Sequence, residues 1–180
     1  DPLTRLGNRR MLAQVLDNLN STHFEPSRPN EKVVFGLILL DLDHFGLYNS
    51  VYGHTEGDSA LRSVGKILSD HILHENDTFC RIGGEEFMLL MVDTSDSETK
   101  QRADSIRRCI EEAQIPHSES STSDYLTASV GFASLSASLD CLDFDLLYDM
   151  ADKALYQAKD RGRNRVVSAF ENSQIEATLY

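Results

Sequence analysis

Two pairs of acidic residues, each beside an extended run, are the side chains of this sequence best suited to chemistry. Asp41 and Asp43 follow an apolar run and are separated by a single residue, so on an extended backbone they point to the same side. Two carboxylates held there repel each other unless a cation lies between them. A solvated strand end whose aspartate caps the next element explains the spacing equally well, and both interpretations stay open from the spacing alone.

The second pair, Glu85 and Glu86, directly follows Gly83-Gly84. Extended runs flank the two glycines, so we predict a hairpin whose tight turn uses the tolerance of glycine for positive φ. If the hairpin lies beside the strand that ends at Asp41, the carboxylates converge, and hard oxygen ligands of this kind suit Mg²⁺ whose shell is completed by phosphates. Two-metal phosphoryl transfer on palm-like folds uses such an arrangement. Because adjacent side chains of a strand face opposite ways, the turn must distort if both glutamates reach one site.

Apolar periodicity predicts the elements that must position these residues. Val33–Leu40 has no polar face, which predicts a central strand covered on both sides, whereas the alternation in Leu126–Phe132 predicts a strand with one buried face. A loop is expected at 21–31, which contains two prolines, and a mobile loop at the serine-rich Ser118–Ser123. The other expected strands are Thr78–Ile82, Glu86–Val92 and Val166–Val167, and the expected helices are Leu12–Leu19, Glu56–Ile72, Ala103–Ala113 and Phe144–Ala158, which Gly162 ends.

Leaving out the terminal helices, the order is strand, helix, strand, strand, helix, strand. This order is typical of ferredoxin-like and polymerase-palm domains, whose sheet contains antiparallel strands and has helices on one face. We therefore predict an α+β fold with a βαββαβ core, flanking helices, and extra N- and C-terminal helices. The domain is expected to span residues 1–170, with a weakly patterned C-terminal tail over 171–180.

The composition excludes several classes of protein. With 17 basic and 29 acidic residues the net charge is −12, which opposes binding to bulk nucleic acid because that binding rests on clustered cations. The 3 cysteines form no CxxC pair, which disfavours a disulfide scaffold or a zinc ribbon and fits a reducing cytoplasm. The longest apolar run falls far short of the roughly 20 residues of a spanning helix. The start at Asp1, without a signal pattern, suggests a domain cut from a longer polypeptide.

Six stretches, in order along Asp1 to Val167, resemble motifs of the GGDEF family, the diguanylate cyclases. One of these motifs alone is weak, but six with matching order and spacing are specific. The signature loop, Arg81–Phe87 (RIGGEEF), has the GGEEF form. The other matching stretches are Asp1–Arg10 (DPLTRLGNRR), Asp41–Phe45 (DLDHF), Tyr52–Asp58 (YGHTEGD), Ser129–Gly131 (SVG) and Ala151–Asn164 (ADKALYQAKDRGRN).

The resemblance implies an enzyme that condenses two GTP into cyclic di-GMP and releases two pyrophosphates. Each domain would bind one GTP, and two domains of a homodimer would face each other so that each ribose 3′-oxygen attacks the other α-phosphate. A sensor or regulatory segment N-terminal to this chain would assemble the dimer. The domain itself would be cytoplasmic, while the sequence leaves open whether the parent protein is soluble or membrane-anchored.

By the same resemblance, Asp41, Glu85 and the backbone carbonyl of Leu42 hold Mg²⁺ or Mn²⁺, with two ions per GTP. Glu85 and Glu86 are the expected catalytic residues. Glu85 is the family's candidate for accepting the 3′-hydroxyl proton, and Glu86 is a further carboxylate at the metals. A metal ion lowers the basicity of a bound carboxylate, so Glu85 is at best a relay for that proton.

The resemblance also assigns residues to the nucleotide. Asn49 and Asp58 match guanine-reading positions, and an acceptor carboxylate at Asp58 suits the N1–H and amino donors of guanine, which adenine lacks. The helix dipole also stabilises a carboxylate in a first turn, so both explanations of Asp58 hold together. His54 is included as a residue near the nucleotide, although a structural hydrogen-bonding role explains it as well. The remaining substrate-binding positions are Phe45, Gly83, Gly84, Lys159 and Arg163.

Lys159 and Arg163 are the cations that the resemblance assigns to the β- and γ-phosphates. They are four residues apart, which predicts a shared face near the end of the last helix. The helix dipole alone also favours cations at that end.

The sequence departs from the family pattern in two regions. Gly46 stands where a lysine usually follows the phenylalanine, and Ser50 stands where an acid is usual. The product-inhibition motif RxxD reads His74-Glu75-Asn76-Asp77. Without the bidentate fork of the arginine, we expect a degenerate inhibitory site at His74 and Asp77 with weak or no feedback binding.

These features support two hypotheses of different classes. The first is a competent diguanylate cyclase domain, favoured by the intact Gly83–Phe87 loop and by Asp41. The second is a catalytically weak module that binds GTP or cyclic di-GMP and regulates a partner, favoured by Gly46 and Ser50. A palm-type polymerase or primase fragment is disfavoured by the acidic charge and by the match along the whole chain.

Overall fold

Six strands form one sheet in the order β1-β3-β4-β2-β5-β6 in the computed structural model, which describes residues 1–20, 32–71, 74–138 and 141–170. The predicted loop at 21–31, the predicted helical residue Ile72 and the predicted tail at 171–180 lie outside the described residues. The strands are β1 (Gly7–Asn8), β2 (Lys32–Leu42), β3 (Thr78–Arg81), β4 (Glu86–Val92), β5 (Ala128–Ser138) and β6 (Val166–Ser168), and the helices are α1 (Arg9–Asn20), α2 (Phe45–Tyr52), α3 (His54–Ser69), α4 (Asp96–Glu112) and α5 (Phe144–Asp160).

The predicted α+β fold with a βαββαβ core is confirmed. β2 lies in the middle of the sheet with β4 and β5 antiparallel on its two sides, and β6 joins β5 in parallel. The extra terminal helices are present as α1 and α5. The apolar run located β2 correctly because a strand covered on both faces needs apolar side chains in both of its alternating rows.

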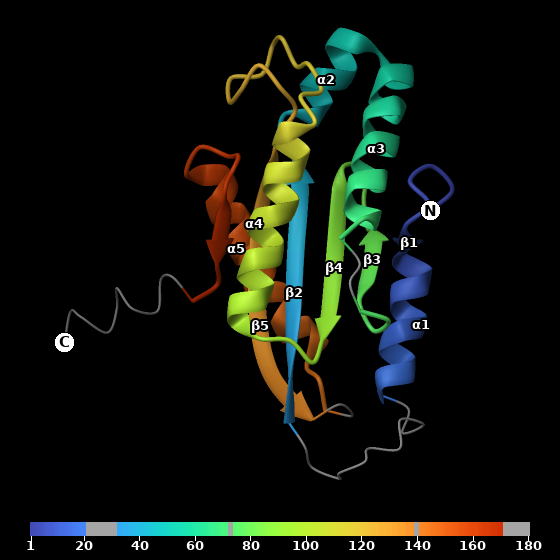
Figure 1. Ribbon diagram of the computed structural model, residues 1–180, viewed down its shortest axis with the longest axis vertical. Helices are drawn as coiled ribbons and strands as arrows, with labels where there is room; N and C mark the ends of the chain where they lie inside the picture. The colour runs from blue at the N-terminus through green and yellow to red at the C-terminus, as the bar shows by residue number, and fades with distance from the viewer. Residues whose placement is uncertain (21–31, 72–73, 139–140, 171–180) are drawn as a thin grey trace, which may run out of the picture.

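Helices cover both faces of the sheet (Figure 1). α3 and α4 pack on one face, against β2 residues such as Ile38 and Leu40. α1 and α5 pack on the opposite face, against Leu37 and Leu39. The prediction of helices on one face therefore holds only for the two core helices, because the terminal helices bury the second row of β2 side chains.

β5 differs from its prediction in length and in burial. It pairs with β2 along its whole length from Ala128 to Ser138, and residues 128–134 are buried on both faces. In the sequence, the small residues that alternate with the apolar ones look like a solvent-exposed face. In the structure this face is covered by a helix that approaches closely. A Cβ added to Gly131 would lie 2.1 Å from the amide nitrogen of Leu155 in α5, so this face is covered rather than solvated.

α2 connects the end of β2 to α3, and no separate helix is predicted there. It is short, it starts after His44, which is left-handed with a φ of 55°, and it ends at Gly53, whose φ of 83° separates it from α3. Such short helices give too few apolar repeats for a periodic signal. α2 lies at the upper end of the sheet in Figure 1, where β2 terminates.

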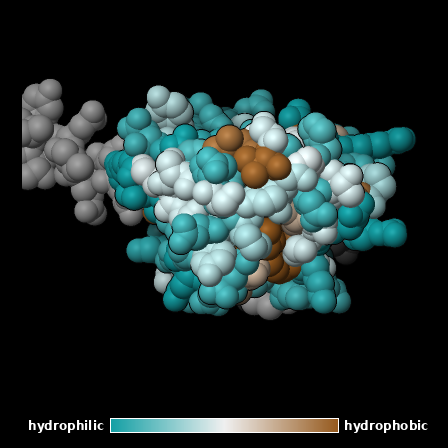
Figure 2. Space-filling view, turned by 90° about the horizontal axis from the view of Figure 1, so that it is seen from above, coloured by the Kyte–Doolittle hydropathy of each residue, from teal (hydrophilic) through white to brown (hydrophobic). Residues whose placement is uncertain are grey.

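The surface at this end of the molecule is mainly hydrophilic. Figure 2 looks onto it and shows teal and white atoms with small brown patches. Among the described side chains, α2 exposes the large apolar residues Leu47 and Val51. None of the described helices is both long and apolar enough to cross a lipid bilayer.

Candidate active site

The hairpin formed by β3 and β4 lies beside β2, as predicted. Asp41 and Glu86 are direct partners in the β2–β4 register, and the backbone N–H of Leu42 donates to the carbonyl of Glu85 at 3.2 Å. The strand positions of Asp41 and Glu86 belong to the face that α5 covers, since alternate residues of both strands pack in the α5 cluster. Acidic residues from distant parts of the chain therefore meet at one end of the sheet.

The Gly83-Gly84 turn does not use positive φ, contrary to the prediction. Among the described glycines, only Gly53 and Gly162 have positive φ. A Cβ on Gly83 would lie 2.2 Å from Oε2 of Glu86, but this is the end of an exposed side chain that can move away, so lack of space does not by itself require glycine there. A Cβ on Gly84 would meet nothing within 4 Å, so the backbone of the turn is open to a ligand on that side.

Two arginines without a predicted role hold this turn. Arg81 donates from Nε and Nη2 to the carbonyl of Gly84, at 3.1 and 2.8 Å. Its Nη1 also lies 3.3 Å from Oδ2 of Asp1, and Nε of Arg9 donates to the carbonyl of Ile82. Both arginines occur in the family motifs, but a motif does not tell whether a residue contacts a ligand or holds the loop that does.

Lys159 of α5 reaches the acidic residues, which we call the acidic cluster (Asp41, Glu85 and Glu86). Its Nζ lies 2.7 Å from Oδ2 of Asp41. Burial raises the pKa of Asp41, the hydrogen bond from Lys159 acts against this rise, and the charges of Glu85 and Glu86 add to it. The carboxylates of the cluster therefore repel one another, so a cation among them is favourable.

The acidic cluster has the chemistry of a magnesium site without being assembled as one. Among the described residues, no three Asp, Glu, His or Cys side chains are placed to hold a metal ion. Asp41 pairs with Lys159 instead. The carboxylate oxygens of Asp41, Glu85 and Glu86 are hard ligands that fit Mg²⁺ or Mn²⁺, provided that Lys159 leaves Asp41 and the glutamates approach it.

Asp43 takes no part in the acidic cluster. It is 2% exposed, and it accepts hydrogen bonds from Oγ1 of Thr127 at 2.7 Å and from Oγ of Ser129 at 2.6 Å. It is therefore not at a solvated strand end, and both of its carboxylate oxygens already accept hydrogen bonds from β5 and the residue before it. The single-residue spacing does not distinguish the two aspartates, whereas their partners do.

The two predicted guanine-reading positions lie together at the junction of α2 and α3. Oδ1 of Asn49 sits over Gly57, where an added Cβ would lie 1.9 Å from it, and Asp58 follows directly and is exposed. His54 is exposed at the first position of α3. Phe45 is only 3% exposed and packs in the core, so its side chain is not available to a ligand.

Arg163 does not share a helical face with Lys159, contrary to the prediction. α5 has already ended at 160, and Arg163 follows with a left-handed φ of 63° after Gly162 at 107°. Lys159 reaches Asp41, whereas Arg163 lies near His44, whose pKa is lowered first by burial and then by the charge of Arg163. The prediction that Gly162 follows the end of the helix is correct.

Asp77, from the predicted inhibitory site, is engaged by another part of the chain. Its side chain is 1% exposed, and its Oδ2 lies 3.5 Å from Nη1 of Arg102 in α4. Neither carboxylate oxygen accepts a hydrogen bond from the described residues. His74 lies in the wall of an adjacent hollow of about 510 Å³, together with His71, Arg102 and Ser105.

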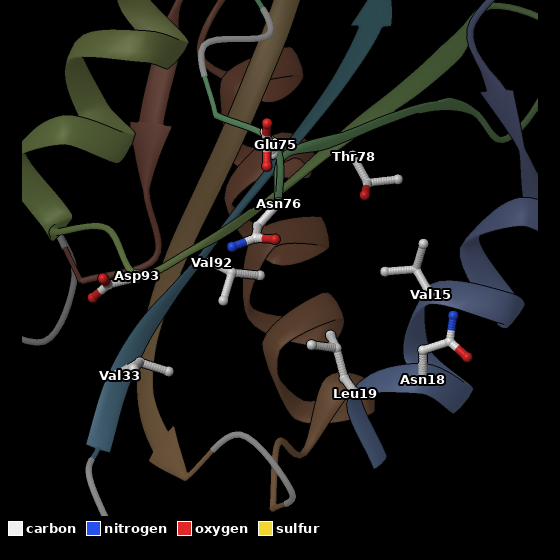
Figure 3. A pocket seen from close by; sticks show the side chains of 9 residues that line it. All are labelled: Val15, Asn18, Leu19, Val33, Glu75, Asn76, Thr78, Val92 and Asp93. Atoms are coloured by element: carbon white, nitrogen blue, oxygen red, sulfur yellow. The ribbon is translucent and has the colours of Figure 1, made fainter. Parts of the chain in front are cut away.

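A second hollow lies between α1 and the strands, away from the acidic cluster (Figure 3). Its volume is about 330 Å³. In Figure 3, Val15 and Leu19 of α1 point toward Val33 and Val92 of the sheet. No predicted site residue lines it, so the functional argument rests on the end of β2.

The comparison with protein families covers almost all of the described chain. The family described as "Diguanylate cyclase, GGDEF domain" matches residues 1–165. This chain belongs to the GGDEF family. The six motifs quoted from the sequence all lie within that match, so the expected resemblance is confirmed.

Curated relatives of this GGDEF domain are named as diguanylate cyclases. The chain is similar to the probable diguanylate cyclase DgcT of Escherichia coli, at 32% identity over 167 residues, which are 93% of this chain and 35% of that protein. It is also similar to diguanylate cyclase A of Treponema denticola, at 34% identity over 146 residues, which are 81% of this chain and 38% of that protein. The chain thus spans little more than a third of the length of these relatives.

Solved structures share the fold of this GGDEF domain. The GGDEF domain of DgcB from Caulobacter crescentus, in complex with c-di-GMP, has a TM-score of 0.77 and 29% identity, and 94% of each chain is covered. The diguanylate cyclase SiaD from Pseudomonas aeruginosa, in complex with its activator SiaC, has a TM-score of 0.74 and 30% identity, covering 93% of this chain and 60% of SiaD.

Proposed function

We propose that this domain is a diguanylate cyclase, a nucleotidyltransferase that condenses two GTP into cyclic di-GMP. The reaction forms 3′,5′-phosphodiester bonds and releases pyrophosphate. The observation that carries the proposal is the acidic cluster, in which Asp41 and Glu86 are register partners and Glu85 is bonded to the end of β2. The GGDEF match over residues 1–165 and the names of the relatives support the same activity.

In this proposal the end of β2 and the adjacent turn hold the metal. Asp41, Glu85 and the backbone carbonyl of Leu42 would bind Mg²⁺ or Mn²⁺, with two ions per GTP. The ions supply positive charge at the reacting phosphate and make the 3′-hydroxyl more acidic. Glu85 relays the proton of that hydroxyl, and Glu86 adds negative charge that keeps the cations in place.

The remaining site residues bind and orient the nucleotide. Lys159, already within the acidic cluster, takes the β- and γ-phosphates together with Arg163. The acceptor groups of Asn49 and Asp58 read the guanine edge, and His54 borders the nucleotide at the start of α3. The turn of Gly83 and Gly84 is open on the Gly84 side and leaves room there for the phosphates, while Phe45, the first residue of α2, contributes by packing in the core rather than by direct contact.

The proposed reaction requires two copies of this domain. One domain offers residues for a single GTP, so two sites of a homodimer must face each other. A sensor or regulatory segment N-terminal to this chain is proposed to bring the domains together in the cytoplasm, where GTP is available. The complex of SiaD with its activator SiaC supports control of such a domain by a bound partner.

A catalytically weak module that binds GTP or cyclic di-GMP and regulates a partner is the second candidate. The sequence favours it at α2, where Gly46 replaces the phosphate-binding lysine. The hydroxyl of Ser50 donates to the carbonyl of Gly46 at 2.9 Å, so this side chain is used within the helix and does not replace the missing acid. Both candidates share the GTP site and differ in turnover.

Turnover by an enforced dimer separates the two candidates. The domain is fused to a dimerising helix, incubated with GTP and Mg²⁺, and the products are resolved by chromatography. The cyclase proposal expects cyclic di-GMP and pyrophosphate from the dimer. Saturable GTP binding without product, measured on the same fusion, would refute the cyclase and leave the module.

A further inference from the structure

The segment that carries Arg163 has an unusual backbone. Gly162, Arg163 and Asn164 have φ values of 107°, 63° and 45°, so three consecutive residues are left-handed. Glycine and asparagine adopt this conformation readily, whereas for Arg163 it is unfavourable and depends on contacts that hold the segment. The residues that enforce it therefore also decide where the guanidinium of Arg163 lies.

Asp43 holds the last of these three residues from the end of β2, while the backbone N–H of Arg163 donates to the carbonyl of Ala158 in α5 at 3.0 Å. Oδ2 of Asp43 accepts the backbone N–H of Asn164 at 3.0 Å in addition to the hydroxyl of Thr127, and its Oδ1 accepts the hydroxyl of Ser129. The backbone N–H of Asp43 donates to the carbonyl of Thr127 at 2.8 Å. The three donors fill the hydrogen-bonding capacity that burial of the Asp43 carboxylate requires. The same carboxylate thus joins the strand β5 to the segment that contains Asn164.

Asn164 is also held from the opposite side by α4. Its Nδ2 donates to Oε1 of Glu111 at 2.7 Å, and its Oδ1 accepts from Nη1 of Arg107 at 2.7 Å. Arg107 and Glu111 form an ion pair with each other, and Arg107, followed by Asn164, lowers the pKa of Glu111. Asn164 thus connects the buried Asp43 to a charged pair on a neighbouring helix.

We propose that Asp43 is a positioning residue for nucleotide binding, which acts by holding Asn164 so that Arg163 is presented to the phosphates. The inference rests on the proposed function, and it extends that function to a residue outside the acidic cluster. It also separates the roles of two aspartates in one motif. Asp41 faces the cations, whereas Asp43 has its hydrogen-bonding capacity filled by Thr127, Ser129 and Asn164 and does not bind metal.

A double-mutant cycle between Asp43 and Arg163 tests this coupling. Binding of a GTP analogue with a non-cleavable α,β bond is measured by calorimetry with Mg²⁺ on wild type, Asp43→Asn, Arg163→Ala and the double variant. Asp43→Asn is expected to weaken binding about tenfold, because an amide replaces a charge-assisted acceptor. In the Arg163→Ala background the same change should have no further effect.

The metal dependence of binding distinguishes positioning from coordination. If Asp43 is a positioning residue, Asp43→Asn leaves the Mn²⁺ concentration at half-saturation unchanged, whereas Asp41→Asn raises it. Equal weakening by Asp43→Asn in both Arg163 backgrounds, or a shifted Mn²⁺ dependence, would overturn the inference. Asp145→Asn, which removes an exposed charge at the other end of α5, controls for the change in net charge.

Asn164→Gly keeps the test decisive if Asp43→Asn does not fold. Glycine retains the backbone N–H to Asp43 and tolerates the left-handed φ, but it loses both contacts to α4. Weaker analogue binding that disappears in the Arg163→Ala background is expected, and unchanged or additive binding overturns the inference. If wild type binds the analogue and the coupling is absent, only the positioning role fails; if wild type does not bind, the proposed function fails with it.

Discussion

At the scale of single residues, opposing contributions act on the ionisation of Asp41. Burial and the neighbouring glutamates disfavour the ionised carboxylate, whereas Lys159 favours it. The same lysine is the proposed phosphate ligand, so the resting protein already holds a cation where the substrate and metal are expected. A site of this kind trades stability for function, because its charges are arranged for the ligand rather than for the fold.

The Asp41→Asn variant tests, through the pH dependence of stability, whether the charge of Asp41 destabilises the fold. The raised pKa of Asp41 makes its ionised form less favourable in the folded protein, so its contribution to stability falls as pH rises from 3.8 through the folded pKa. The Asp41→Asn variant has no ionisable carboxylate at this position, so it lacks this decrease in stability. Its melting temperature relative to wild type, measured with chelator at about pH 4 and pH 7, is expected to increase with pH while cyclase activity is lost. A relative decrease would contradict the direction of the pKa shift.

Gly46→Lys tests whether the departure at α2 limits nucleotide binding. A Cβ at this position would meet nothing within 4 Å, so a side chain is accommodated, and replacing a helical glycine adds about 0.5–1 kcal/mol of stability. The added cation is expected to lower the KM for GTP about fivefold, as one charge-assisted contact would. Gly46→Gln should give the same stability without the change in KM, and equal KM values for the two variants would rule out the phosphate contact.

At the scale of elements, the contact of α5 with β5 positions the cations of the site. Gly131 allows this contact, since a Cβ there would lie 2.1 Å from the backbone of Leu155. The helix consequently runs close to the sheet and ends near β2, where Lys159 meets Asp41. The serine-rich segment predicted as a mobile loop is also held to α2, because Tyr52 accepts the backbone N–H of Ser118 at 2.8 Å.

Gly131→Ala is expected to displace α5 and to destabilise the fold. The added methyl overlaps backbone atoms that cannot rotate away, and overpacking of this kind costs about 1–3 kcal/mol. Chemical denaturation measures the loss. Gly84→Ala is the matched control, because its Cβ meets nothing within 4 Å, and its stability should stay within about 0.5 kcal/mol of wild type. A Gly131→Ala protein with the same unfolding free energy as the control would show that α5 can move away from β5 without loss of stability.

At the scale of the whole molecule, a chain with a net charge of −12 is proposed to bind a polyphosphate. Attraction must then be local, through the metal ions at the acidic cluster and through Lys159 and Arg163, because the overall charge repels the substrate. The prediction of weak feedback by the product likewise depends on a local contact. Asp77 is paired with the buried Arg102, and an aspartate engaged in this way is not available to a ligand.

Titration with cyclic di-GMP tests the proposed weak feedback. Inhibition of the enforced dimer is expected to be weak, and Asp77→Ala should leave it unchanged. The same variant removes the ion-pair partner of Arg102, which still donates to the carbonyl of His71, so we expect a loss of unfolding free energy below the value of about 3 kcal/mol typical of a hydrogen-bonded buried pair. Asp77→Asn, which keeps the volume and a polar group, should lose less. Tight inhibition of wild type that Asp77→Ala relieves would show that the inhibitory site is functional.

The sequence by itself determined most of the elements and the family of this protein. The apolar runs located β2 and α5, and the motifs identified the GGDEF family, because hydrophobic periodicity and short motifs are local properties of the chain. Local patterns do not contain the contacts of residues that are far apart. The sequence-based predictions differ from the structure at the two faces of β5, at the short helix α2 and at the backbone of the Gly83-Gly84 turn, which depend on such contacts.

Only the tertiary structure decided which acidic and basic residues act together. Asp41 and Asp43 are equivalent by spacing, but Lys159 pairs with the first and the backbone of Asn164 bonds to the second. Arg163 leaves the helix that its spacing predicts, because the left-handed residues after α5 redirect the chain. A buried charge takes the partners that the fold brings within hydrogen-bonding distance, and these come from strands, helices and loops that adjacency in the sequence does not reveal.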